Sequence, residues 1–244
     1  MAGSIKTEAV VLRSIRYGEA DRILHLYTLD RGRLSAIAKG SRKPRSRFGG
    51  RLEPFFRLDL TLHEGRSELL TVTGASTLAG YGRLRSSGPA IGAAARACDA
   101  VLRLLDSSEP NRPAYNLLCR YLDLLDSSPA AARGPAASGR AAGLAFRLKL
   151  ALAAGFVPEL ASCARCGEAE GITSFSGAAG GVVCASCEAG GFELSQQAHG
   201  FMVAALGRPL AELPAADEAA LRQVERAIGD VLAHHAHVHL RAVA

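Results

Sequence analysis

The chain has 244 residues, of which 48% are hydrophobic, and it carries 29 Lys and Arg against 23 Asp and Glu. This length and apolar fraction indicate a globular protein of one large or two ordinary domains and argue against a disordered chain. No apolar run approaches the roughly 18 residues that a membrane-spanning helix needs, and no signal-peptide pattern is evident. We therefore expect a cytoplasmic protein without a membrane partner.

The net charge of +6 is unevenly distributed along the sequence. Residues 1–80 contain 14 Lys and Arg and 8 Asp and Glu, whereas residues 81–244 contain 15 of each. The whole excess of positive charge therefore lies in the first third of the chain, as is typical of nucleic-acid-binding domains. A membrane-surface protein would instead show a basic amphipathic helix with bulky apolar residues, and we find none near this charge.

The first 80 residues predict five short strands separated by glycine-containing turns. Five strands in this length predict a small closed or nearly closed barrel of the OB or SH3-like type, and the strand count alone does not separate the two. The expected strands are Ile5–Arg13, Arg22–Thr28, Leu34–Ala38, Arg57–His63 and Glu68–Thr73.

The most basic stretch of the chain, Lys39–Arg51, lies between the third and fourth expected strands and reads KGSRKPRSRFGGR. It contains no acidic residue, and its glycines and Pro44 are incompatible with a long helix or strand. We interpret it as a cationic loop directed toward a polyanion. The alternative is a solvated loop without a ligand, although such a loop has no need to exclude Asp and Glu.

Beyond Gly88-Pro89 the sequence becomes rich in Ala, Leu and Arg, with apolar residues at helical spacing. We therefore expect a barrel domain at residues 1–80 and a helical domain at residues 81–244. Ser127–Arg140, which is rich in Ala, Pro, Gly and Ser, is expected to be a mobile loop. The expected helices are Ala90–Leu105, Ala114–Leu125, Ala141–Ala154, Ser195–Leu206 and Asp217–Leu240.

Four of the six cysteines form two CxxC pairs, Cys163/Cys166 and Cys184/Cys187, separated by 17 residues. This spacing predicts a zinc ribbon at about residues 160–190, because each pair places two thiolates on one ion and two pairs complete a tetrahedron. Disulfides are disfavoured in a cytoplasmic chain, a thioredoxin-type motif needs one CxxC and not two, and a catalytic zinc needs an open coordination position. We therefore expect one structural Zn²⁺ per chain.

The last expected helix contains four histidines, His234, His235, His237 and His239. Their spacing could suit a metal, but no carboxylate lies at a matching position, so we interpret them as a solvated or partner-facing helix end. The sequence has no Walker-type glycine loop, HExxH motif or nucleophile elbow, and its acidic residues form no two-metal pattern. These features favour a binding protein over an enzyme.

Two segments resemble the bacterial recombination mediator family RecO: Gly18–Phe56, which includes the basic loop, and Gly155–Gly167, which includes the first CxxC pair. The order of barrel, helical domain and zinc ribbon also matches, so the resemblance covers essentially the whole length. It implies a non-enzymatic protein with an OB-fold barrel and a helical bundle, located in the cytoplasm at the nucleoid. Some members of the family lack the four cysteines, so zinc is not essential to the shared activity.

The resemblance also implies a set of partners. Members of the family bind single- and double-stranded DNA, anneal complementary strands, and work with RecR to displace single-strand-binding protein so that RecA can load. The helical domain, which has no net charge, is then the expected docking surface for the acidic C-terminal tail of single-strand-binding protein.

The resemblance and the charge distribution converge on the barrel and its loop as the DNA-binding region. Four arginines on neighbouring turns are weaker candidates for phosphate contacts: Arg16, Arg22, Arg31 and Arg33. Phe48 and Tyr17 are the candidates for base stacking, with a place in the barrel core as the alternative for each. The main candidates for phosphate contacts are the six cations of the loop: Lys39, Arg42, Lys43, Arg45, Arg47 and Arg51.

Two other functions remain open from the residues alone. The same barrel and ribbon could belong to an RNA-binding or transcription-associated module. The chain could also be a nuclease or another DNA-processing enzyme whose acidic residues meet only in the folded protein.

Overall fold

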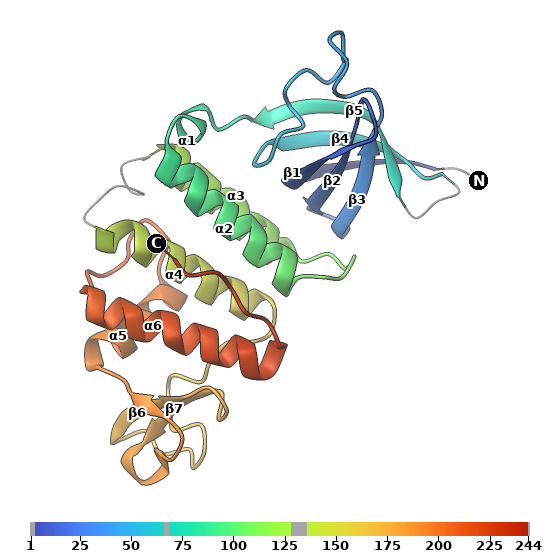
Figure 1. Cartoon of the computed structure of the whole chain (residues 1–244). Helices are drawn as coiled ribbons and strands as arrows, with labels where there is room; N and C mark the ends of the chain where they lie inside the picture. The colour runs from blue at the N-terminus through green and yellow to red at the C-terminus, as the bar shows by residue number, and fades with distance from the viewer. Residues whose placement is uncertain (1–2, 66–68, 128–135, 244) are drawn as a thin grey trace. The chain divides into compact units, whose positions relative to one another are not determined.

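The computed structural model describes residues 3–65, 69–127 and 136–243 (Figure 1). The chain divides into two compact units, Met1–Asp126 and Ser127–Ala244. In the described part of the chain, the first unit holds a β-barrel and three helices, and the second holds three α-helices and a small sheet. No helix in the described ranges has the length and apolar character that a membrane crossing requires.

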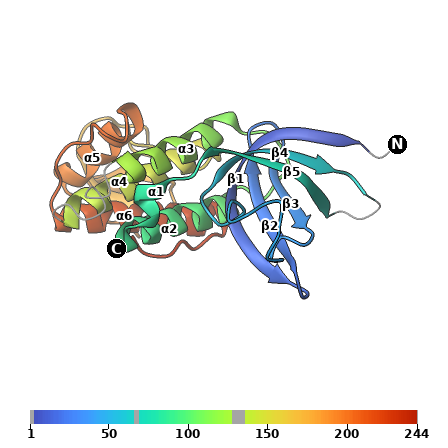
Figure 2. The same cartoon turned by 90° about the horizontal axis from the view of Figure 1, so that it is seen from above.

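The first unit begins with a closed five-stranded barrel, whose strands curve around one another in Figure 2. The strands are hydrogen-bonded in the order β1-β2-β3-β5-β4, with β1 also paired to β4, and β3 runs parallel to β5. This order is that of an OB-fold, so it confirms the OB-type barrel and excludes an SH3-like barrel, in which the third and fourth strands are neighbours. The strands are β1 (Ser4–Tyr17), β2 (Asp21–Thr28), β3 (Gly32–Ala38), β4 (Arg57–His63) and β5 (Leu70–Ala79).

Two strands are longer than the sequence predicts. β1 continues past Arg13 to Tyr17, and an irregularity in its pairing between Val11 and Arg13 lets its first half pair with β4 and its second half with β2. β5 continues to Ala79, while the expected start of this strand at Glu68 lies outside the described residues. Both extensions pair with the strand that neighbours them in the sequence: the end of β1 pairs with β2, and the end of β5 pairs with β4.

The interior of the barrel is filled by apolar side chains from its five strands. Two further residues, Phe48 and Leu52, enter this core from the segment between β3 and β4, and each is 2% exposed. The basic segment is therefore anchored in the barrel by its own apolar residues.

Three helices complete the first unit: α1 (Gly82–Arg85), α2 (Gly88–Leu104) and α3 (Arg112–Ser127). The sequence predicted α2 and α3 to within two residues, but it gave no signal for the single turn α1. α2 contacts β1, and Val10 and Tyr27, which are paired across β1 and β2, are 0% and 1% exposed. The helices therefore cover one end of the outer surface of the β1–β2–β3 sheet.

The second unit packs α4 (Ala136–Ala153), α5 (Gln196–Gly207) and α6 (Glu218–Val231) against one another. Ser195 and Asp217 are the N-caps of α5 and α6, because their side chains accept hydrogen bonds from the N–H groups three residues later.

Two boundaries in this unit differ from the prediction. The expected mobile loop is wrong at its end, since residues 136–140 begin α4, and Arg140 forms ion pairs with Glu218 and Glu225 of α6. Residues 128–135 of that loop lie outside the described residues. The last helix ends early, because α6 passes into a π-helical turn, Leu232–Ala236, and His237 has a φ of +54°.

A three-stranded sheet in the order β7-β6-β8 lies between α4 and α5 in the sequence. Its strands are β6 (Ile172–Ser176), β7 (Gly181–Cys184) and β8 (Phe192–Glu193), and β7 is followed by a short 3₁₀ helix, Ala185–Cys187. The ribbon expected between the two CxxC pairs is thus present.

Candidate nucleic-acid interface and metal centre

The basic loop Lys39–Arg51 leaves β3 as a series of turns and is fixed at its base to the β1–β2 turn. The N–H of Gly40 donates to Asp21 Oδ1 at 2.7 Å, and the N–H of Arg42 donates to the carbonyl oxygen of Ala20 at 2.8 Å. Backbone groups make these two bonds, so they fix the loop without engaging its cationic side chains.

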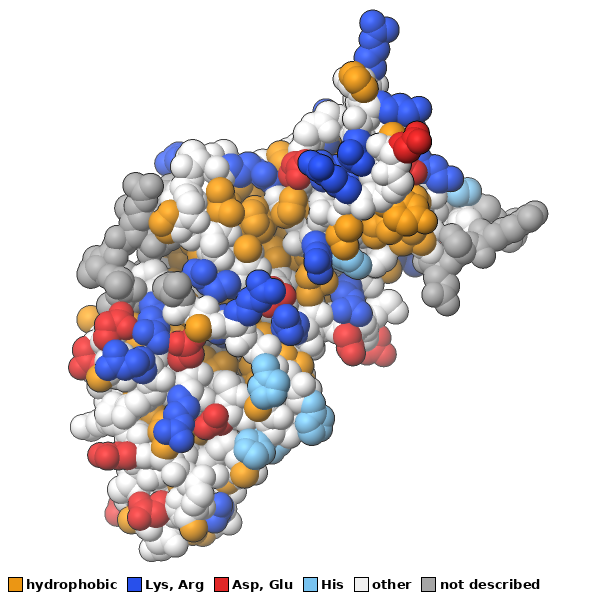
Figure 3. All heavy atoms as spheres, viewed as in Figure 1, with side chains coloured by type: hydrophobic (Ala, Val, Ile, Leu, Met, Phe, Trp, Pro, Cys, Tyr) orange, Lys and Arg blue, Asp and Glu red, His pale blue; other side chains and the backbone are white. Residues whose placement is uncertain are grey.

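Most of the cations on this loop are exposed, and Figure 3 shows Lys and Arg side chains projecting from the loop at the top of the view. The side chains of Arg42 and Arg47 donate long hydrogen bonds, of 3.3 and 3.4 Å, to backbone carbonyls, and the Arg47 guanidinium lies 4.8 Å from the centre of the Phe48 ring. Within residues 3–65, 69–127 and 136–243, no carboxylate forms an ion pair with a cation of the loop. The exposed cations are Lys39, Arg42, Lys43, Arg45 and Arg47.

The other two candidates within the loop are engaged with the barrel. Arg51 is half-buried and donates through Nη1 to the carbonyl oxygen of Ala75 at 3.0 Å. Phe48 is 2% exposed in the barrel core. A base cannot stack on a ring buried in this way, so the predicted stacking role of Phe48 is wrong, and it takes the core position that was its alternative.

The candidates on the neighbouring turns fall into two groups. Arg22 and Arg33 have structural partners: Arg22 forms an ion pair with Glu53 at 2.7 Å, and Arg33 donates to the carbonyl oxygen of Leu102 at 2.9 Å. Arg16 and Arg31 are exposed, and Tyr17 is 53% exposed beside the turn that anchors the loop. These last three remain predicted DNA contacts.

The fold reveals an outer surface on β1–β2–β3 that the sequence did not single out. Ile15 pairs with Ile23, and Ile23 pairs with Ile37, so the three isoleucines form a row across the strands. The next outward row contains Arg13, His25 and Ser35. Each strand shows the alternation of inward and outward side chains in its sequence. Which outward residues of neighbouring strands lie side by side could be assigned only from the pairing register.

His25 lies among cationic groups on this outer surface. Burial is the largest cause that lowers the pKa of His25, and the guanidinium groups of Arg13 and Arg33 lower it further. Its ring Nδ1 lies 3.2 Å from Ser35 Oγ. An anion bound beside His25 would raise its pKa and favour the protonated ring.

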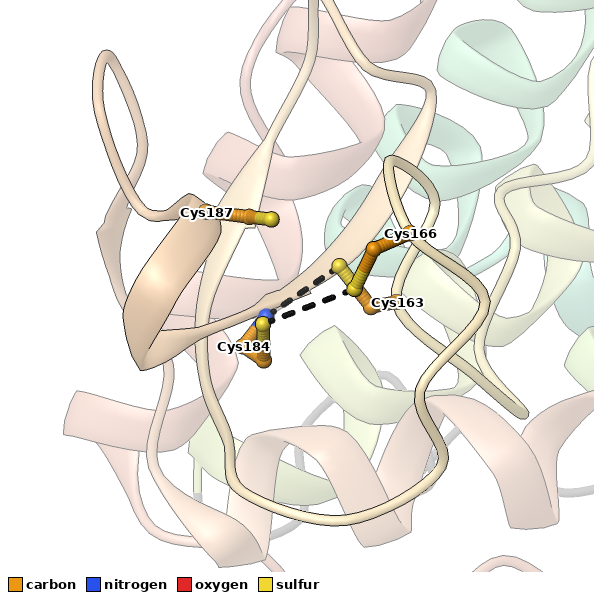
Figure 4. A group of neighbouring side chains, drawn as sticks. All are labelled: Cys163, Cys166, Cys184 and Cys187. Carbon is orange, nitrogen blue, oxygen red and sulfur yellow. Dashed lines mark hydrogen bonds between the residues drawn. The ribbon is translucent and has the colours of Figure 1, made fainter.

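In the second unit, the four cysteines of the two CxxC pairs converge on one point (Figure 4). All four sulfur atoms lie within 4.8 Å of one another, and Cys166 Sγ is 3.8 Å from Cys184 Sγ. For a Zn–S bond of about 2.3 Å, a regular tetrahedron has S···S edges of about 3.8 Å. The arrangement therefore fits a tetrahedral metal ion.

Neighbouring groups shift the pKa values of two of these thiols in opposite directions. The N–H of Cys184 donates to Cys163 Sγ at 3.4 Å and is the main cause that lowers the pKa of Cys163 to about 6. The neighbouring Cys184 thiol is the main cause that raises the pKa of Cys187 to about 12. Four thiolates at this separation repel one another, so they need a bound cation to ionise together.

Local backbone geometry holds the first pair in place. Gly167 has a φ of +79°, which favours glycine, and its N–H donates to the carbonyl oxygen of Cys163 at 2.8 Å. The histidines do not take part, since no histidine in the described part of the chain joins the cysteines or forms a second such cluster. His235 instead contacts the ribbon, with Nε2 2.9 Å from the carbonyl oxygen of Gly177.

The fold and these sites define an OB-fold protein with an exposed cationic loop, followed by a helical unit that carries a four-cysteine ribbon. The family described as "Recombination protein O N terminal" matches residues 1–81, and the family described as "Recombination protein O C terminal" matches residues 85–243. The change from one to the other falls where the barrel ends.

Individual relatives agree with this assignment. The DNA repair protein RecO of Rubrobacter xylanophilus is 40% identical over 239 residues, which cover 96% of this chain and 91% of that protein. The DNA repair protein RecO of Anaeromyxobacter sp. (strain K) is 37% identical over 95% of this chain and 91% of that protein. The chain therefore belongs to the RecO family of DNA repair proteins.

Proposed function

We propose that this protein is a recombination mediator that binds single- and double-stranded DNA and anneals complementary strands. Together with RecR, it would help to displace single-strand-binding protein so that RecA can load. The observation that carries the proposal is the basic loop, which is fixed at its base to an OB barrel and whose exposed cations have no carboxylate partner among the described residues. Membership of the RecO family supports the same function.

The proposed mechanism is electrostatic and involves no covalent chemistry. Arg42, Lys43, Arg45 and Arg47 would neutralise the phosphates of two strands at once, which lowers their mutual repulsion and releases counterions. Base pairing between the strands would then supply the specificity. A binding protein of this kind would act in the cytoplasm, at the nucleoid.

We assign a structural zinc ion to the four cysteines Cys163, Cys166, Cys184 and Cys187. The support is the tetrahedral spacing of their sulfur atoms and the closed set of four thiolate donors, which leaves no open position for catalysis. The ion would stabilise the ribbon and would take no part in DNA binding.

For the acidic tail of single-strand-binding protein, we propose a groove of about 440 Å³ between β8 and α6. Arg222 and Arg226 are exposed along one side of it, and the Arg226 guanidinium lies 4.1 Å from the centre of the Phe192 ring. Two cations beside an aromatic ring complement an acidic peptide, which would compete with Asp230, 3.6 Å from Arg226 Nε. A charge-reversing pair, Arg222→Glu with Arg226→Glu, should abolish binding of a labelled tail peptide and leave binding of naked DNA unchanged.

Annealing of complementary oligonucleotides tests the main proposal. The purified protein should bind single-stranded DNA and accelerate annealing without nucleotide or added divalent metal. An absence of both activities would contradict the proposal. A divalent-metal-dependent loss of the DNA would instead indicate a nuclease, and selective binding of RNA would indicate the RNA-binding alternative.

A further inference from the structure

The outer surface of β1–β2–β3 carries four apolar side chains outside the barrel core, which we name the apolar platform: Ile15, Tyr17, Ile23 and Ile37. Ile15 is 37% exposed and Tyr17 is 53% exposed, while Ile23 and Ile37 are half-buried. Tyr17 and Ile15 lie two residues apart on β1, so they project from the same face. The strand register places the three isoleucines side by side.

The platform differs from the rest of the outward surface of these strands. At the other end of the β1–β2 pair, Val10 and Tyr27 are 0% and 1% exposed, because α2 and the α2–α3 connection pack over that end. The helical cover stops before the platform. Within the part of the chain that the structure describes, Ile15 and Tyr17 are therefore exposed, and Ile23 and Ile37 are partly exposed.

Cationic groups border the platform on two sides. On one side, Arg13 is the cation of the adjacent outward row, where it pairs with His25. On the other side, Arg42 reaches back to the carbonyl oxygen of Gly18, the residue after Tyr17. Figure 3 shows hydrophobic side chains gathered over the barrel with Lys and Arg side chains around them.

This combination of charge and apolar surface selects one kind of ligand. Any polyanion can form ion pairs with the cations. Only a polyanion with apolar faces can also pack against the isoleucines and Tyr17. Unpaired bases of a single strand offer such faces, whereas a duplex hides them in its stack.

Building on the proposed DNA-binding function, we infer that the apolar platform binds unpaired bases of single-stranded DNA while the basic loop binds phosphates. The platform then distinguishes single strands from duplex, and the loop does not. When two strands pair, their bases leave the platform, and the annealed product retains only the phosphate contacts. Because the annealed duplex loses the base contacts with the platform and keeps only the phosphate contacts with the loop, its release is favoured.

The test compares three labelled DNAs at one salt concentration: an oligothymidylate, an abasic strand of equal length and charge, and a duplex. Because the chain contains no Trp, intrinsic tryptophan fluorescence cannot report binding, so the fluorescence anisotropy of the labelled DNA is measured instead. The wild-type protein should bind oligothymidylate about tenfold more tightly than the abasic strand, since only the former offers bases to the platform. The triple variant Ile15→Thr, Ile23→Thr, Ile37→Thr keeps β-branched side chains and should lose most of this difference.

Two further measurements separate this role from a general effect on folding or charge. The triple variant should bind the duplex as the wild type does and should keep the wild-type salt dependence, since it removes no cation. Leu78→Thr is the matched control, because Leu78 is a 47% exposed apolar residue on β5, away from the platform. This control should leave all three affinities unchanged.

The possible failures are distinguishable. If the wild type binds oligothymidylate and the abasic strand equally, or if the triple variant keeps the difference, the platform inference is wrong while DNA binding stands. If the wild type binds none of the three DNAs, the proposed function itself fails.

Discussion

In the first unit, the backbone N–H of Arg33 donates a hydrogen bond of 3.1 Å to the carbonyl oxygen of Ser107, which joins the start of β3 to the α2–α3 connection. The guanidinium of Arg33 also donates to the carbonyl oxygen of Leu102 at 2.9 Å. Because the backbone and the side chain of one residue both bond to the helical segment, the barrel and these helices form a packed body. The arginine that the sequence suggested as a DNA contact thus has a structural role.

Gly32, the residue before Arg33, gives a prediction about the stability of the fold. Gly32 has a φ of +55°, and a Cβ at this position would lie 2.3 Å from the carbonyl oxygen of Glu109. We expect Gly32→Ala to lower the free energy of unfolding by at least about 3 kcal/mol, from the combined cost of conformation and overlap. Urea denaturation of the full chain measures it.

Gly49 provides the matched control for this substitution. It has the same φ of +55°, but a Cβ there would have no atom within 4 Å. Gly49→Ala should therefore cost only the conformational part, about 1–2 kcal/mol. Equal losses in the two variants would show that the contact with the α2–α3 connection contributes nothing.

The basic loop gives a prediction about salt dependence. Replacing Arg42, Lys43, Arg45 and Arg47 with Ala should flatten the slope of log K against log salt for single strands by up to about 2.8, at roughly 0.7 per phosphate contact. Replacing the three arginines with Lys keeps the charge and should leave the slope nearly unchanged. An unchanged slope in the alanine variant would mean that the loop does not contact DNA.

Metal analysis tests the ribbon. Elemental analysis should find one zinc per chain, and Cys163→Ser should lose most of it, since three thiolates bind zinc more weakly than four. Chelation should unfold the ribbon, because binding supplies on the order of 10 kcal/mol toward its folding. Binding of DNA by the barrel should persist.

The other cysteines supply a control for the metal analysis. Burial raises the pKa of Cys98, which lies in α2, to about 12, so its thiol stays protonated. Cys98→Ala should retain the full zinc content. Full retention of zinc in Cys163→Ser would instead contradict the assignment.

His25 gives a prediction about pH. Its pKa in the folded protein is lowered, so the unfolded chain, with a His pKa of about 6.5, binds this proton more readily. The free energy of unfolding should therefore fall as the pH decreases through about 6.5, and His25→Gln should remove part of that fall. Denaturant titrations of both proteins from about pH 8 to pH 5 measure the difference.

The affinity for DNA should change with pH in the opposite direction to the stability, through the same residue, His25. Phosphates next to His25 favour its charged form, so the affinity for single strands should rise as the pH decreases from about 8 to 6. His25→Gln should reduce this rise, whereas the control His63→Gln, at an exposed position on β4, should not. An identical rise in wild type and His25→Gln would show that DNA does not approach His25.

Elements that depend on local sequence patterns could be predicted, whereas features that depend on contacts between residues far apart in the sequence could not. The strand β4 and the four-cysteine ribbon could be predicted because alternation and CxxC spacing are local signals. For Phe48 the sequence left base stacking and a core position open, because a glycine-rich basic segment does not indicate which of its residues fills the barrel. The early start of α4 depends on Arg140 pairing with Glu218 and Glu225, which lie 78 and 85 residues away.

The anchoring of the basic loop limits how its sequence can change. Phe48 and Leu52 belong to the barrel core, and Gly40 is bonded to the β1–β2 turn, so the loop has fixed points at both ends. Arg42, Lys43 and Arg45, which lie between these points, are exposed, so we expect them to be exchangeable without disturbing the core. Substitution is therefore tolerated where deletion is not, and a graft of this loop onto another OB barrel would have to include Phe48 and Leu52 as well as the charges.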